Sequence, residues 1–279
     1  MTVLEVLTAA TEYLTRQSVE SPRLNAEHLL AHVLGKERRI DLYLEFERPV
    51  GEAERAPLRE LVKRRAAGEP LQHLLGTVGF CGRLFFSDKR ALIARPETEQ
   101  LVEAILARAT GENGRALDVG TGSGVIALTL ALERPAWSVV AVDVSPEALT
   151  LTAENRARHS LEERVELREG DLGAGIEGPF YVIAANLPYI PAAEIPGLAR
   201  EVQWDPKLAL DGGADGLDLI RRLIPQARDL LAPGGLLALE IGHDQAPAVA
   251  ALLEENNYRD IERLPDYQNI ERFLIARHG

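Results

Sequence analysis

The stretch that decides the fold is residues 115–124, which read RALDVGTGSG. A short strand pattern runs directly into three glycines at alternate positions. Such glycines let backbone amides approach a ligand without obstruction by a Cβ atom. A plain tight turn would not need three of them. The stretch therefore predicts a ligand-binding loop between a strand and a helix that begins near Val125.

Strand and helix patterns alternate from this loop to the end of the chain. Further strands are expected at 138–143, 165–169, 180–185 and 236–241, around Ile261, and at 273–276. Helical stripes lie between most of them. This alternation predicts an α/β fold, with a parallel sheet covered by helices on both faces.

The first seventy residues are helical by period instead. Thr2 and Glu5 have the spacing of a capping box, and Ser21 places a cap residue before Pro22 in a first helical turn. Short apolar runs separated by glycines follow, and they predict a β-hairpin linker. We therefore expect a helical bundle domain at 1–70, a hairpin linker at 71–95 and the α/β domain at 96–279.

Composition limits the classes of function. The net charge is −12, which disfavours tight non-specific binding to nucleic acid. The single cysteine, Cys81, excludes a disulfide framework and a multi-cysteine zinc ribbon, and we expect no metal site. The N-terminus has no signal-peptide pattern, and no apolar run reaches about 18 residues. A cytoplasmic protein without membrane contact is expected.

The spacing of the glycines selects among nucleotide ligands. The dinucleotide fingerprint requires a glycine where this chain has Val125, and the lysine of a Walker loop is absent. Asp143 ends the next strand, about 20 residues after Gly124, where an acid can accept hydrogen bonds from ribose hydroxyls. Its alternative role is to cap the helix that begins at Ser145. Loop and acid together describe a nucleoside without a pyrophosphate, and S-adenosylmethionine fits that description.

A second motif, Asn186-Leu187-Pro188-Tyr189, follows the strongly apolar strand at 180–185. Ligands bind outside the carboxyl ends of such strands, so Asn186 is expected in the same crevice as the glycine loop. Its amide oxygen can accept one N–H of a substrate –NH₂ group, and the carbonyl of Leu187 can accept the other. Pro188 stiffens the turn, and Tyr189 offers a flat apolar face. The plainer alternative is a proline turn with a core tyrosine.

Two fixed acceptors suit methyl transfer to an amide or aryl-amine nitrogen. Such a nitrogen is a weak nucleophile because its lone pair is delocalised. Two acceptors orient both hydrogens and aim the lone pair at the incoming carbon, so that catalysis rests on alignment and needs no strong base. Glu240, at the end of the fifth strand, could line the same crevice or cap Gly242.

The sequence resembles the HemK/PrmC-type N5-glutamine methyltransferases almost from end to end. The segments that carry the resemblance are 21–27 (SPRLNAE), 68–71 (GEPL), 95–99 (RPETE), 118–124 (DVGTGSG), 186–189 (NLPY) and 208–213 (LALDGG). Many methyltransferases share the glycine motif, and adenine-N6 enzymes share Asn-x-Pro-Tyr, so the combination is the specific signal. The resemblance implies a class I S-adenosylmethionine-dependent methyltransferase fold, Rossmann-like with a seven-stranded sheet, beside a small N-terminal helical bundle.

The resemblance also implies the reaction and the site. The enzyme would methylate the side-chain amide (N5) of the glutamine in the Gly-Gly-Gln motif of peptide chain release factors. S-adenosylmethionine would be the donor and S-adenosylhomocysteine the product. The helical domain would grip the release factor, and a monomer is expected. The expected cofactor-binding residues are Gly120, Thr121, Gly122, Ser123, Gly124, Asp143, Asp171, Leu172 and Asn186, and the expected catalytic residues are Asn186, Leu187, Pro188 and Tyr189.

Two positions depart from the family pattern. The family usually has proline where this chain has Leu187, although leucine supplies the same backbone carbonyl. The family often has an aromatic residue after the acid of the third-strand loop, where Leu172 follows Asp171 here. We expect aliphatic packing against the adenine and a hydrogen bond from its amino group to Asp171.

Three other functions stay open on the sequence. One is a glutamine methyltransferase that acts on a ribosomal protein. Another is an adenine-N6 methyltransferase of DNA or RNA, against which the charge of −12 argues. The third is a non-catalytic regulator that binds S-adenosylmethionine, against which the intact motif at 186–189 argues.

Overall fold

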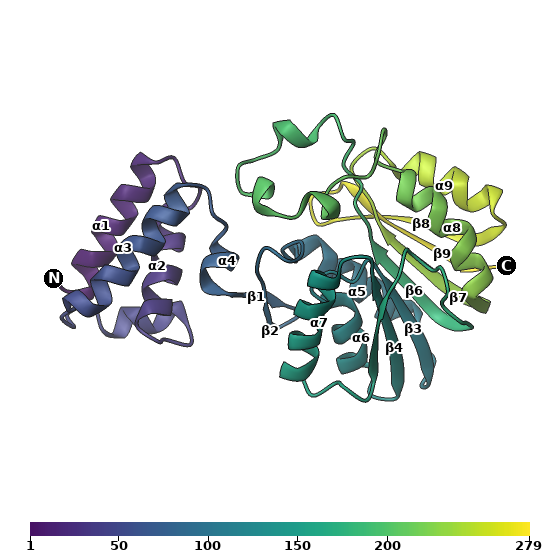
Figure 1. The fold of residues 1–279 in the computed structure, drawn as a ribbon, viewed down its shortest axis with the longest axis horizontal. Helices are drawn as coiled ribbons and strands as arrows, with labels where there is room; N and C mark the ends of the chain where they lie inside the picture. The colour runs from purple at the N-terminus through teal and green to yellow at the C-terminus, as the bar shows by residue number, and fades with distance from the viewer. The chain divides into compact units, whose positions relative to one another are not determined.

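The computed structural model describes residues 1–279 and divides them into two compact units (Figure 1). We call Met1–Thr77 with Ala199–Trp204 the helical unit, and Val78–Leu198 with Asp205–Gly279 the sheet unit. The helical unit extends beyond residue 70 because a further short helix follows there. The functional division into gripping domain, linker and catalytic domain stays a prediction. No helix is both long enough and apolar enough to cross a bilayer.

Four α-helices surround the apolar core of the helical unit. They are α1 (Val3–Arg16), α2 (Pro22–Val33), α3 (Glu52–Ala66) and α4 (Leu71–Leu75). The predicted capping box is confirmed, since the Thr2 side chain accepts from the amide of Glu5 and the Glu5 side chain accepts from the amide of Thr2. Ser21 is the N-cap residue and Pro22 opens the helix, as predicted, but the Ser21 side chain makes no capping bond, because its φ of 47° is left-handed. A side-chain cap requires extended backbone at that position.

Residues Ala199–Trp204 join the helical unit from far along the chain. Arg65 is buried there, donates to Asn25 Oδ1 at 2.6 Å and pairs with Glu201. Arg200 donates to the carbonyl of Ala67 at 2.9 Å. A buried guanidinium is stable only when it is paired, so the ion pair ties this segment to α3.

Seven strands form one mixed sheet in the sheet unit. They are β3 (Gly114–Val119), β4 (Trp137–Asp143), β5 (Val165–Glu169), β6 (Phe180–Asn186), β7 (Leu231–Glu240), β8 (Tyr258–Pro265) and β9 (Glu271–His278). Their order is β5-β4-β3-β6-β7-β9-β8, and every one was predicted. The expectation of a wholly parallel sheet is wrong, because β9 is antiparallel to both β7 and β8. A short turn joins β8 to β9, and such a turn can only reverse the chain.

Helices cover both faces of this sheet, as Figure 1 shows. One face carries α5 (Pro96–Arg108), α6 (Val125–Glu133) and α7 (Pro146–Arg158), and the other carries α8 (Asp218–Leu230) and α9 (Ala246–Glu255). Successive strand residues point to opposite faces. Ala116 and Val182 therefore belong to the core under α5 and α6, whereas Leu117 and Ile183 belong to the core under α8 and α9. The hairpin of β1 (Thr77–Phe80) and β2 (Arg83–Phe86) adds Phe80 and Phe85 to the first core.

The strand order places the carboxyl ends of β3 and β6 next to each other. The chain goes from β3 outward through β4 to β5 and then returns to the other side of β3 with β6. In the register of this pair, Val119 lies beside Ala185. The glycine loop and the Asn186 motif therefore leave the sheet at its topological switch point, where α/β folds bind their ligands.

Candidate active site

A cavity of about 350 Å³ opens at the carboxyl ends of β3, β4 and β6. Its volume is that of a small-molecule site. Ten of the predicted site residues line it: Gly120, Thr121, Gly122, Ser123, Asp143, Asp171, Leu172, Asn186, Leu187 and Pro188. The fold thus brings together segments that the sequence indicated separately.

The glycine loop depends on close approach at two of its three glycines. Gly120, Gly122 and Gly124 have φ values of 72°, 58° and 84°, which L residues with a side chain rarely adopt. A Cβ atom on Gly120 would lie 2.9 Å from Cδ2 of Leu187, and one on Gly124 would lie 2.6 Å from Cγ2 of Thr152. Gly120 thus lets Leu187 close over the loop. Gly124 lies outside the cavity lining, where it lets α6 approach α7.

Asp118 holds the glycine loop through hydrogen bonds. The sequence did not predict it as a site residue. It is fully buried, and its Oδ2 accepts from Thr121 Oγ1 at 2.6 Å and from the amide of Ala127 at 3.0 Å. Burial raises its pKa to about 7 in spite of these bonds. The carboxyl group connects the end of β3, the loop and the first turn of α6, which fixes the path of the loop.

Asp143 lies at the cavity wall and holds the glycine loop. Its Oδ2 accepts from the amide of Gly122 at 2.8 Å, and its Oδ1 accepts from the amide of Ser145 at 2.9 Å. The cap of α7 comes from the Ser145 hydroxyl, which accepts from the amide of Ala148 at 3.2 Å. Burial raises the pKa of Asp143. Each of its oxygens keeps acceptor capacity for a ligand.

Three arginines line the cavity, and each is paired with carboxylates. The pairs are Arg90 with Asp88 and Glu154, Arg95 with Asp205, and Arg222 with Asp171. Phosphate groups are usually held by cationic side chains that are free to bind them. Paired arginines favour a ligand without phosphate, in agreement with the glycine spacing. Asp171, expected to face an adenine, is also engaged by Arg222.

The loop after β6 is braced by the segment that contains LALDGG. The amide of Ile190 donates to the carbonyl of Leu210 at 3.2 Å, and the amide of Gly212 donates to the carbonyl of Ile190 at 2.9 Å. Gly216, with a φ of 81°, passes so close that a Cβ atom would lie 2.2 Å from the carbonyl oxygen of Tyr189. The segment therefore stabilises the loop that follows the Asn186 motif.

We expect Gly216→Ala to lower the free energy of unfolding by about 2–4 kcal/mol, from the left-handed backbone and the overpacking together. Chemical denaturation followed by circular dichroism measures it. Gly197→Ala is the matched control, because a Cβ atom there meets nothing within 4 Å and its φ is not positive. Equal stability of the two variants would show that the loop yields freely to the new methyl group.

Gln245 also stabilises the loop after β6, and the sequence did not indicate this role. Its Nε2 donates to the carbonyl of Tyr189 at 2.9 Å, and its Oε1 accepts from the amide of Gly242 at 2.8 Å. The suggestion that Glu240 caps Gly242 is therefore wrong, and Glu240 does not line the cavity either. Tyr189 does not line the cavity. Burial raises the pKa of its phenol to about 12, so it stays neutral and is no base at physiological pH.

Asn186 is held through its amide nitrogen. Its Nδ2 donates to Thr98 Oγ1 at 3.1 Å, and the Thr98 hydroxyl donates to Glu240 Oε2 at 2.8 Å. Asn186 and Thr98 both line the cavity. The nitrogen is committed to the protein, so the amide oxygen is the atom that can accept from a ligand.

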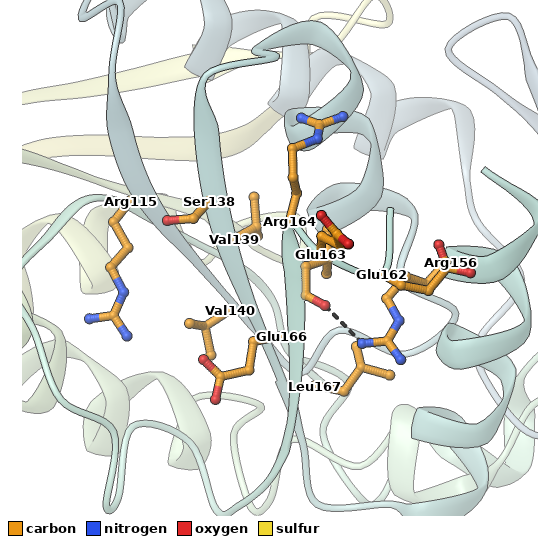
Figure 2. Close-up of a pocket in the computed structure, with 11 residues that line it drawn as sticks. Arg115, Ser138, Val139, Val140, Arg156, Glu162, Glu163, Arg164, Glu166 and Leu167 are labelled. Atoms are coloured by element: carbon orange, nitrogen blue, oxygen red, sulfur yellow. Dashed lines mark hydrogen bonds between the residues drawn. The ribbon is translucent and has the colours of Figure 1, made fainter. Parts of the chain in front are cut away.

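A second cavity, of about 430 Å³, lies toward the amino ends of the strands, away from the first cavity (Figure 2). It is lined from the amino ends of β3, β4 and β5, with Arg115, Ser138 and Glu166 among its side chains. The dashed line in Figure 2 is the bond from Arg156 to the carbonyl of Val165, at 2.9 Å. None of the predicted site residues lies here, so position in the sheet and not size selects the first cavity. No group of three or more His, Cys, Asp or Glu side chains could hold a metal ion.

Comparison with known proteins decides the family. The chain is 44% identical over 280 residues to the release factor glutamine methyltransferase of Deinococcus radiodurans, covering 100% of this chain and 99% of that protein. The chain belongs to the release factor glutamine methyltransferase family. The relative of the same name from Moorella thermoacetica is 44% identical over 279 residues, 99% of this chain and 98% of the relative. The resemblance seen in the sequence is confirmed.

Family models and solved structures agree with this membership. The model of the PrmC N-terminal domain matches residues 5–76, and that of the methyltransferase small domain matches residues 91–199. A solved methyltransferase from Pyrococcus furiosus superposes with a TM-score of 0.53 at 21% identity, over 70% of this chain and 88% of that chain. The predicted class I methyltransferase fold is confirmed.

Proposed function

We propose that this protein transfers a methyl group from S-adenosylmethionine to the side-chain amide nitrogen (N5) of the glutamine in the Gly-Gly-Gln motif of peptide chain release factors. The observation that carries the proposal is the shared cavity: the glycine loop and Asn186 line the same small-molecule site. Membership of a family whose relatives bear the name release factor glutamine methyltransferase supports both the acceptor group and the protein that carries it.

The residues of the cavity fit S-adenosylmethionine. The left-handed backbone at Gly120 and Gly122 keeps Cβ atoms away from the ligand side of the loop. Asp143 would accept hydrogen bonds from the ribose hydroxyls, and Asp171 and Leu172 would border the adenine. Paired arginines suit a ligand that has no phosphate. When bound, the cofactor supplies a methyl group on a sulfonium, which is a good leaving group.

Asn186 and Leu187 would hold the glutamine amide. The amide oxygen of Asn186 accepts one hydrogen of the substrate –NH₂ group, and the carbonyl of Leu187 accepts the other. Both bonds strengthen as the nitrogen gains positive charge, so they stabilise the transition state more than the bound substrate. Pro188 and Tyr189 shape the turn. The nitrogen becomes acidic as it is methylated and loses its proton to solvent, so no strong base is needed.

The proposal extends to the binding partner, the oligomeric state and the cellular compartment of the protein. The helical unit helps to bind the release factor, and the protein acts as a monomer in the cytoplasm. The net charge of −12 makes a nucleic-acid substrate unfavourable.

The experiment is transfer of labelled methyl from S-adenosylmethionine to purified release factor, ribosomal proteins and DNA in parallel. We expect label on the release factor, and none on a release factor whose Gly-Gly-Gln glutamine is replaced by alanine. Label on ribosomal protein or DNA instead would replace the proposed substrate. Binding of S-adenosylmethionine with no transfer to any of them would identify a regulator.

A further inference from the structure

Glu240 is a buried acid beneath the proposed substrate site, and the chemistry above gives it no role. It is 2% exposed and lies directly beside Asn186 in the register of β6 and β7. Thr98, also 2% exposed, stands in the first turn of α5 and bonds to both side chains. Glu240, Thr98 and Asn186 form one chain of hydrogen bonds, which we call the Asn186 relay.

The direction of the relay follows from counting protons. A threonine hydroxyl has one hydrogen to donate. An ionised Glu240 has no hydrogen to donate, so Thr98 gives its hydrogen to Glu240 Oε2 and can only accept on the other side. Its partner in Asn186 must then be Nδ2, which leaves Oδ1 for the substrate. A protonated Glu240 can donate to Thr98 instead, which frees the hydroxyl hydrogen to bind Oδ1 and permits the reversed amide.

We propose that Thr98 and Glu240 are positioning residues that fix which atom of the Asn186 amide faces the substrate nitrogen. The inference rests on the proposed function, because it concerns the same substrate amide. A reversed Asn186 would present N–H groups to the N–H groups of the glutamine, and the lone pair would lose its alignment with the methyl carbon. The relay therefore acts on turnover and leaves the nucleoside end of the cavity unchanged.

The charge of Glu240 changes in the physiological range. Burial raises its pKa to about 7, while the hydrogen bond from Thr98 opposes this rise. Two other charged side chains act on it: Glu97 at the start of α5 raises the pKa, and Arg272 on β9 lowers it. Tyr189 also interacts electrostatically with Glu240, and it stays neutral because its pKa is raised to about 12. Glu240 is thus ionised above about pH 7 and neutral below it.

The first test removes the hydroxyl of Thr98 and then restores it. We expect Thr98→Val to lower kcat for methylation of the release factor roughly 10- to 100-fold, as misplacement of a reacting group does. Thr98→Ser keeps the hydroxyl and should restore kcat to within about threefold of wild type. The binding of S-adenosylhomocysteine, measured by calorimetry, should stay within about threefold in both, which reports a folded cofactor site.

Thr129→Val is the matched control. Thr129 is fully buried in α6, and its hydroxyl has no hydrogen-bond partner, so this variant should keep wild-type kcat. Equal kcat of Thr98→Val and Thr129→Val would overturn the proposal, and so would a Thr98→Ser variant as slow as Thr98→Val. Wild-type protein runs in the same assay, so failure of the proposed function shows as no transfer by any variant.

The second test is the pH profile of kcat, which reports groups in the substrate complex. We expect wild-type kcat to fall as the pH drops below about 7. The Glu240→Gln side chain is neutral at every pH, and its carbonyl can still accept from Thr98, so its profile should be flat from about pH 6 to 8. An acidic limb that persists unchanged in Glu240→Gln would assign it to another acid, such as Asp118, and would contradict the proposal.

Discussion

Replacement of Asn186 by alanine is expected to lower kcat for glutamine methylation by about 100-fold or more. The substitution removes the acceptor that holds one hydrogen of the substrate amide, and this bond is worth most when the nitrogen carries positive charge. The affinity for S-adenosylmethionine should change by no more than a few fold, because the glycine loop and Asp143 keep their mutual bond. Initial rates of labelled methyl transfer and calorimetric binding together measure the two effects.

Asn256→Ala serves as the control for this loss. Asn256 directly follows α9, and its side-chain amide donates only to the carbonyl of Leu252, at 2.8 Å. The same substitution there should leave transfer within about twofold, since it removes only one local bond at a helix end. Turnover by Asn186→Ala close to that of Asn256→Ala would remove Asn186 from the proposed catalytic role.

Replacement of Asp143 by alanine should act on cofactor affinity first. A hydrogen bond to a charged group contributes about 1.5–3 kcal/mol, so we expect S-adenosylmethionine to bind roughly 10- to 100-fold more weakly. The amide of Gly122 also loses its partner, which loosens the loop at the same wall. With saturating cofactor, kcat should recover most of its wild-type value, because Asn186 and Leu187 are untouched.

A surface aspartate provides the comparison. Asp229 is largely exposed and pairs only with the neighbouring Arg228, at 2.9 Å, so Asp229→Ala should bind the cofactor as wild type does. Calorimetry measures the dissociation constant of S-adenosylmethionine for both variants. An unchanged dissociation constant for Asp143→Ala would place the ribose elsewhere in the cavity.

Local patterns predicted the elements that local physics controls. The apolar runs of β6 and β7 and the capping box at Thr2 depend on neighbours a few residues away, and they formed as expected. The glycine loop was found for the same reason. Its positive φ values require glycines, and these glycines stand close together in the sequence. The antiparallel β9 was missed because strand direction depends on the connection and not on the strand's own residues.

Parts of the site were missed because they depend on contacts between distant segments. Thr98 reads as an ordinary first-turn residue of a helix, yet it meets Asn186 and Glu240, which follow it by more than eighty residues. Gln245 likewise reads as a helix start, although its side chain braces the carbonyl of Tyr189. Such pairings become visible only once the sheet order is known.

Leu187 illustrates how a departure from the family pattern is accommodated. The leucine side chain is buried and closes over Gly120, where even a methyl group would lie only 2.9 Å from it. Its packing against the loop supplies a constraint that a proline ring would supply through the backbone. The carbonyl at this position does not depend on the side chain.

The most direct measurement is a crystal structure of the protein with S-adenosylhomocysteine and a peptide that contains Gly-Gly-Gln. We expect the glutamine –NH₂ group to donate to Asn186 Oδ1 and to the carbonyl of Leu187, each at about 3 Å, with its nitrogen facing the cofactor sulfur. Asn186 turned away from the glutamine, or an amide bound elsewhere in the cavity, would contradict the proposed catalytic role of this residue.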